Sequence, residues 1–146
     1  MSWDHAFGLA NLAAMAGWAV LILLPRWQRI VDGLRYGLVG ALALTYAGLV
    51  MVYFAGSGGG FDSIAAVRTL FASDPVLLAG WLHYLAFDLF VGIWIAEQAD
   101  ALGLSRWLQA PILVATFMFG PLGLVVFLLW KGAYGARTFL AGGVKS

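Results

Sequence analysis

Two side chains that can exchange protons lie within one apolar stretch of the sequence. His83 and Asp88 both occur in residues 76–96, a stretch that is long and apolar enough to cross a lipid bilayer. A carboxyl group near the bilayer centre costs about 2.5–3.5 kcal/mol on insertion scales, so such groups usually face a protein interior and have a function. Asp88 is therefore the first candidate for a functional residue, and a structural hydrogen bond between helices is the alternative.

The spacing of these residues limits how they can act together. His83 precedes Asp88 by five positions, which is about 140° around an ideal α-helix and ~7.5 Å along its axis. The two side chains therefore line two sides of one cavity, or each faces a different neighbouring helix. Tyr84 lies four positions before Asp88 and is placed to hydrogen-bond to it along one face.

Several kinds of chemistry do not fit this sequence. It contains no cysteine for thiolate catalysis or an iron–sulfur cluster, and its two histidines are too few for a histidine-rich metal centre. No dinucleotide, P-loop or nucleophile-elbow motif occurs. A net charge of +1 gives no general attraction to nucleic acid. We therefore expect no metal, no cofactor and no nucleic-acid partner.

The composition is that of a membrane protein. Hydrophobic residues make up 63% and charged residues only 10%, which leaves too few charges to cover a soluble domain of 146 residues. We expect an all-α polytopic membrane protein with one domain over residues 1–146. Four transmembrane helices are predicted, each close to the ~20 residues that a ~30 Å hydrocarbon core requires: residues 6–24, 36–54, 76–96 and 108–129.

Helix breakers and short motifs mark the connections between these spans. Pro25 ends the first span, which lacks the basic leader of a secretory signal and is therefore expected to be retained. The glycine-rich residues 56–60 predict a flexible loop. Apolar residues recur at helical spacing over residues 62–71, which predicts a short amphipathic helix between the second and third spans. Pro121 predicts a kink in the fourth span.

Orientation in the membrane is weakly specified. Four spans place both termini on one side, and the Lys and Arg residues divide equally between the two sides. The compact basic linker, residues 26–35, favours a cytoplasmic first linker with both termini outside. A dual-topology antiparallel dimer is the alternative.

The topology also predicts a cavity near the middle of the membrane. Asn11 and His83 lie at similar depth in spans that run in the same direction, while Thr45 and the Gly120-Pro121 pair lie near the midplane. The aromatic side chains of the third and fourth spans suit a flat or long unsaturated ligand, with lipid contact or core packing as the alternative. The expected binding residues are Asn11, Thr45, Tyr84, Phe87, Trp94, Phe117, Phe119, Gly120 and Pro121.

Two sequence blocks resemble a known family. The blocks are GWLHYLAFDLFVGIW at residues 80–94 and PILVATFMFGPLG at residues 111–123. They resemble the abscisic-acid-deficient-four-like membrane proteins, whose plant members are associated with neoxanthin synthesis from violaxanthin in plastids. This chain lacks a Ser-rich plastid transit segment and has the length of a bacterial member. We therefore expect it in a bacterial inner or intracytoplasmic membrane.

The resemblance implies an intramolecular isomerisation of a xanthophyll epoxide. The epoxide opens to a tertiary alcohol while a neighbouring carbon-bound proton leaves and an allene forms, which requires an acid and a base but no redox cofactor. Asp88 as the acid with His83 as the base, or the reverse, are the expected catalytic residues.

Two other function classes fit the same residues. One is a non-catalytic subunit that binds carotenoid or lipid in a larger membrane complex, such as a photosynthetic one, with His83 and Asp88 in structural roles. The other is a small proton-coupled transporter in which Asp88 carries the proton. The expected partners are membrane lipids, a carotenoid, and further copies of the chain or a larger complex.

Overall fold

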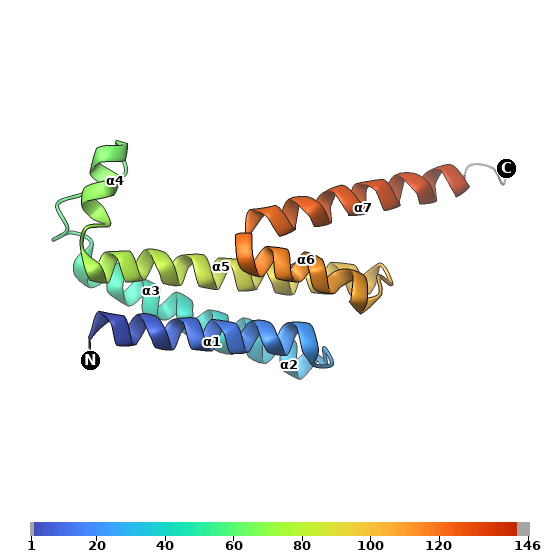
Figure 1. Cartoon of the computed structure of the whole chain (residues 1–146), viewed down its shortest axis with the longest axis horizontal. Coiled ribbons are helices and arrows are strands. Elements are labelled where there is room, and N and C mark those ends of the chain that lie inside the picture. Colours follow the sequence, from blue (N-terminus) through green and yellow to red (C-terminus); the bar gives the residue numbers. More distant parts are fainter. Residues whose placement is uncertain (1, 143–146) are drawn as a thin grey trace. The chain divides into compact units, whose positions relative to one another are not determined.

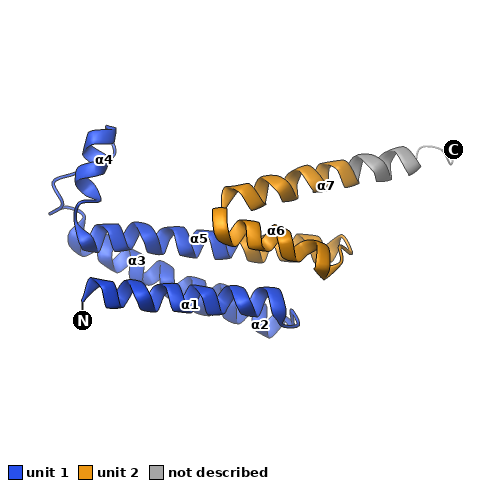
Figure 2. Cartoon of the chain, viewed as in Figure 1, with its two compact units in different colours: residues 1–90 blue, residues 91–146 orange. Residues whose placement is uncertain are grey.

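The described part of the chain is helical and divides into two compact units. The computed structural model describes residues 2–142, with side chains for residues 2–134, and contains no strand within that range. Residues 1–90 form the first unit and residues 91–146 the second (Figure 2). Helix α5 (Asp74–Ala101) contributes its first part to one unit and its last part to the other. The predicted all-α fold is confirmed for the described residues.

The first unit contains two further long helices beside the start of α5. Helix α1 (Trp3–Leu23) begins after Ser2, whose hydroxyl accepts a hydrogen bond from the His5 backbone N–H at 3.3 Å. A second continuous helix covers Gln28–Tyr53. It consists of α2 (Gln28–Asp32), a π-helical segment η1 (Gly33–Val39) and α3 (Gly40–Tyr53). In Figure 1 these helices lie side by side with the first part of α5.

Small and aliphatic side chains form the contact between these helices. The core of the first unit consists of Ala14, Leu42, Leu78, Leu82, Leu85 and Ala86. At Gly17 the approach is so close that an added Cβ would overlap the Leu38 side chain and lie 3.1 Å from Leu89. Glycine at this position therefore allows α1 to pack closely against its neighbours.

A short helix, α4 (Ile64–Leu70), lies where the sequence predicts one between the second and third spans. Its first turn is capped by Ser63, whose hydroxyl accepts a hydrogen bond from the Ala66 N–H at 3.1 Å. Its last residue, Leu70, is only 1% exposed. The preceding loop packs closely on it, because an added Cβ at Gly59 would overlap the Leu70 backbone. These contacts hold α4 in place.

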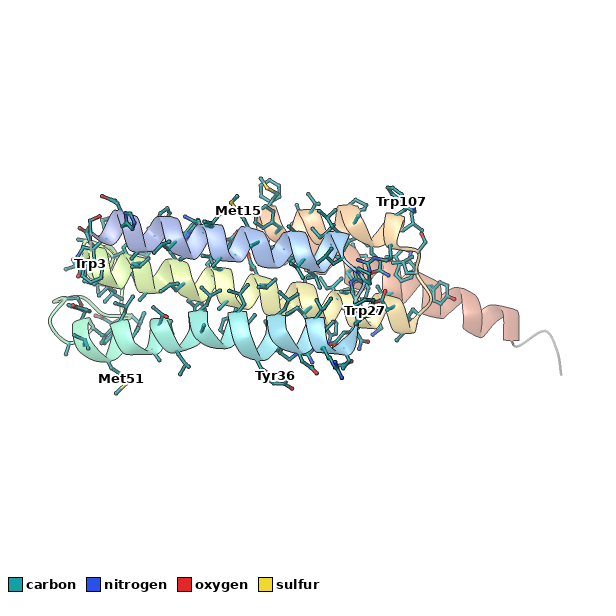
Figure 3. The ribbon with its side chains drawn as sticks, turned by 90° about the horizontal axis from the view of Figure 1, so that it is seen from below. Trp3, Met15, Trp27, Tyr36, Met51 and Trp107 are labelled. Atoms are coloured by element: carbon teal, nitrogen blue, oxygen red, sulfur yellow. The ribbon has the colours of Figure 1, made fainter. Side chains whose placement is uncertain are left out.

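Three helices of the described chain are long and apolar enough to cross a membrane. They are Trp3–Leu23, Gln28–Tyr53 and Asp74–Ala101. Figure 3 shows Met15, Tyr36 and Met51 directed away from these helices, where an apolar outer surface suits lipid. By length and composition, these helices indicate a membrane protein.

The structure divides the predicted fourth span, residues 108–129, into two helices. Helix α6 (Arg106–Phe119) ends at Gly120, and α7 (Pro121–Gly142) runs back beside it (Figure 1). Gly120 has φ +47° and ψ −96°, a conformation that side chains disfavour, so the chain reverses where a proline kink was expected. With 14 residues, α6 is about 21 Å long, shorter than the ~30 Å hydrocarbon core. A fourth crossing therefore stays a prediction.

Close packing at one glycine holds the α6–α7 hairpin together. An added Cβ at Gly123 would overlap the Thr116 hydroxyl and backbone N, and would lie 2.6 Å from the Thr116 Cα. Thr116 is fully buried, and its hydroxyl donates to the Ile112 carbonyl at 2.9 Å. The α6 backbone and the start of α7 are therefore in direct contact.

Buried polar and aromatic contacts join α6 and α7 to the last part of α5. Gln109 is fully buried, and its amide donates to Asp100 Oδ1 at 2.7 Å and to the Leu104 carbonyl at 2.6 Å. Trp94 on α5 makes an edge-to-face contact with the buried Phe127 of α7, with ring centroids 5.7 Å apart. These contacts make the second unit a compact helical body.

Candidate ligand cavity

An apolar cavity of about 490 Å³, called the aromatic cavity below, lies in the first unit. Its volume is in the size range of small-molecule sites. Tyr46 and Val50 of α3 form one wall, and the rings of Phe54 and Phe61 stack at 5.5 Å across the glycine-rich loop. Leu70, Phe71, Val76, Ala79, Gly80 and His83 complete the lining from α4, the residue that follows it, and α5. Among these described residues, only Tyr46 and His83 have polar side chains. The cavity therefore suits a largely apolar ligand with a polar substituent.

His83 is held between two aromatic rings at the cavity. Its imidazole stacks on Phe87, with centroids 4.5 Å apart and planes at 28°. The ring of Tyr46 lies 5.4 Å away, at 55°. Because one ring comes from α5 and the other from α3, the imidazole plane is fixed from two sides. The two polar groups of the cavity are thus neighbours that can act on the same part of a ligand.

Asp88 lies on the same helix as His83 but does not line this cavity. It is half-buried and is not among the described residues that line the cavity. It interacts with Tyr84, one helical turn earlier, as the spacing predicts. Its Oδ2 atom is buried without a hydrogen-bond partner within the described structure. The structure therefore does not bring His83 and Asp88 together in one cavity, although both are on α5.

Asn11 joins α1 to α5. Its side-chain oxygen accepts a hydrogen bond from the Trp81 indole N–H at 2.8 Å. The Trp81 ring in turn lies 5.4 Å from Phe7 and 5.2 Å from Tyr84. Asn11 and Tyr84 thus belong to a line of contacts between two helices, and neither lines the cavity.

Replacing Asn11 with leucine should weaken this helix contact. Leucine leaves the Trp81 N–H without its acceptor, and hydrogen bonds between membrane helices contribute about 0.6 kcal/mol on average. We expect a loss of ~0.5–1.5 kcal/mol in unfolding free energy in detergent, the usual net range for one hydrogen bond. Leu12→Ala, at an exposed position on the same helix, is the control. Equal stability of Asn11→Leu and the wild type would show that the bond contributes nothing.

The other predicted binding residues are distributed over both units. Thr45 is exposed, and its hydroxyl donates to the Ala41 carbonyl of its own helix at 2.8 Å. Phe87 contacts the cavity histidine. The five remaining residues, which are Trp94, Phe117, Phe119, Gly120 and Pro121, belong to the second unit. Of these, Gly120 and Pro121 form the break between α6 and α7.

Of the residues that line the cavity, sequence reasoning named only His83 as a site residue, and it also missed Trp81. Tyr46, Phe71 and Gly80 line the cavity, and Trp81 binds Asn11. A usable signal existed for Tyr46 and Trp81, because aromatic residues with a polar tip inside a span need a hydrogen-bonding or aromatic neighbour. Phe71 and Gly80 carried no such signal, because their importance comes only from the contact of Phe71, just after α4, with α5.

A second cavity of about 660 Å³ lies between the starts of α1 and α5. The carboxylates of Asp4 and Asp74 lie among its lining residues, together with Trp3, Phe7 and Trp81. Burying two carboxylates against an apolar molecule is costly, so this cavity suits such a ligand less well. Within the described side chains, no three His, Asp or Glu residues gather in a way that could hold a metal ion.

Comparison with known proteins identifies the family. The profile of the ABA DEFICIENT 4-like family matches residues 5–127, most of the chain. The chain belongs to this family. The matched range includes every residue that lines the aromatic cavity, and the turn between α6 and α7. No curated protein and no solved structure shows a match.

Proposed function

We propose that this ABA DEFICIENT 4-like chain binds a carotenoid in a bacterial inner membrane and isomerises one of its oxygenated end rings. The observation that carries the proposal is the aromatic cavity of the first unit, with His83 and Tyr46 as its polar side chains. The family match supports a carotenoid as the ligand. The cavity would receive the end ring, and the polyene would extend from it along the apolar helices.

The chemistry needs one proton donor and one base. In opening the epoxide of violaxanthin to an allenic alcohol, an epoxide C–O bond and a neighbouring C–H bond break, an O–H bond forms, and the C–H electron pair becomes the new C=C bond of the allene. Atoms and charge balance without a co-reactant. The Tyr46 hydroxyl would give its proton to the epoxide oxygen, and the neutral His83 imidazole would take the carbon-bound proton. Transfer from His83 back to Tyr46 would complete the cycle.

This assignment gives Tyr46 the proton-donor role that the family resemblance implied for Asp88 in one of its two assignments. The rings of Tyr46 and His83 are 5.4 Å apart, whereas Asp88 is not among the residues that line the cavity. Asp88 would then support the site indirectly through Tyr84 and the contacts of α5. It touches neither the ligand nor the reacting atoms in this proposal.

The proposal can be tested with violaxanthin and the purified full chain in nanodiscs. We expect the wild type to bind the pigment and to convert it to an allenic isomer, measured by absorption and chromatography. Val50→Phe should weaken binding about tenfold or more, because the larger ring occupies the cavity. Val52→Phe is the matched control, since Val52 on the same helix is 69% exposed.

The outcomes separate the candidate functions. Bound pigment without product would favour a non-catalytic carotenoid-binding subunit. Absence of binding to the folded wild type, or equal binding by both phenylalanine variants, would count against the carotenoid proposal as a whole.

A further inference from the structure

One glycine lets an aromatic ring rest on the backbone of α5 beside the cavity. Phe71 directly follows α4, and its ring faces Gly80. An added Cβ at Gly80 would lie 2.5, 3.2 and 3.6 Å from three atoms of that ring. Contacts below about 3 Å require one partner to move. Any larger residue at position 80 therefore displaces the Phe71 ring.

Both residues belong to the cavity wall. Gly80 and Phe71 line it, and Gly80 lies three positions before His83, so the two share a face of α5. The Phe71 side chain is 39% exposed and can turn, whereas Leu70 beside it is buried and fixes the end of α4. A change at Gly80 therefore acts on the Phe71 ring more readily than on the α4 backbone.

We infer that the contact between Gly80 and Phe71 sets the size of the ring that the cavity admits. The inference rests on the proposed function, because the ring in question is the end group of a carotenoid. Gly80 and Phe71 are specificity-determining residues in this view and take no part in proton transfer. The space that glycine leaves open, together with the position of the Phe71 ring, determines the width of the cavity.

Gly80→Ala tests the effect of cavity width on binding without weakening helix α5. In a helix interior, alanine is more favourable than glycine by about 0.5–1 kcal/mol, so the helix itself is not weakened. We expect violaxanthin, which has cyclic ends, to bind about tenfold more weakly, as for one extra methylene in an apolar pocket. Lycopene, whose ends are open chains, should change much less.

Two further variants complete the test in nanodiscs. Gly8→Ala lies on α1 with open space around its Cβ and should bind both pigments as the wild type does. Gly80→Ala combined with Phe71→Leu should recover violaxanthin binding, because the smaller side chain makes room for the new methyl group. Equal affinities of Gly80→Ala and the wild type, or failure of the double variant to recover, would overturn the inference.

A smaller probe keeps this inference separate from the proposed function. β-Ionone represents an isolated carotenoid end ring, and its binding can be followed by saturation-transfer NMR. If the wild type binds β-ionone but no carotenoid, the proposed function fails, and weaker β-ionone binding by Gly80→Ala still supports the size-setting contact. If the wild type binds none of these molecules, both proposals are wrong.

Discussion

His83→Ala should slow the conversion of violaxanthin by orders of magnitude while leaving the protein folded. A positioned acid or base contributes about 10²–10⁴-fold to a rate, and we expect a loss within that range. The His83 side chain is exposed within the first unit and contacts only the neighbouring rings of Phe87 and Tyr46 among the ring contacts described. Its removal should therefore cost little stability. The rate of allenic product formation, measured at saturating pigment, tests the expectation.

The chain contains a matched control for this variant. His5, the other histidine, lies in the first turn of α1 and does not line the aromatic cavity. His5→Ala should convert violaxanthin at the wild-type rate. Tyr46→Phe should lose activity but retain the bound pigment, because the ring that forms the wall remains. An active His83→Ala variant would exclude His83 as the base.

Gly123→Ala is expected to have the largest effect on stability. The new methyl group would overlap the backbone of Thr116, and backbone atoms cannot turn aside as a side-chain end can. Overpacking in a close-packed core typically costs 1–3 kcal/mol, and separating α6 from α7 should place this variant at about the upper limit of that range. Thermal unfolding of the full chain in detergent, followed by circular dichroism, measures the loss.

A second glycine of α7 provides the comparison. Gly132 has open space where a Cβ would be added. Gly132→Ala should therefore keep the wild-type unfolding temperature or raise it slightly, since alanine favours the helix. If Gly123→Ala unfolds at the same temperature as Gly132→Ala, then close packing at Gly123 does not hold the hairpin.

Local sequence signals predicted the helices of the first unit well. Pro25, the glycine-rich loop at residues 56–60 and the apolar spacing over residues 62–71 all act within a few residues, so their effects can be read directly from the chain. The family was also recognisable, because its two blocks are continuous segments. The turn at Gly120 was not predictable in the same way, since proline alone indicates a kink, while the reversal also depends on Gly123 packing against Thr116.

The candidate site was predicted less completely because it depends on helix rotation. Adjacent residues on a helix point about 100° apart, so depth alone could not distinguish Thr45 from Tyr46. In the structure, Tyr46 lines the cavity, whereas the Thr45 hydroxyl donates a hydrogen bond to the Ala41 carbonyl of its own helix. The same uncertainty applied to His83 and Asp88, whose spacing allowed one shared cavity or two separate environments.

The π-helical segment η1 changes the rotation of α3 about the helix axis. A π-helical turn holds more residues than an α-helical turn, so seven residues wound in this way shift the phase of α3 relative to a uniform α-helix. Tyr46 comes seven residues after the end of η1 and inherits that shift. The π-helical winding of Gly33–Val39 thus determines the direction in which Tyr46 points toward the cavity, although Gly33–Val39 does not line the cavity.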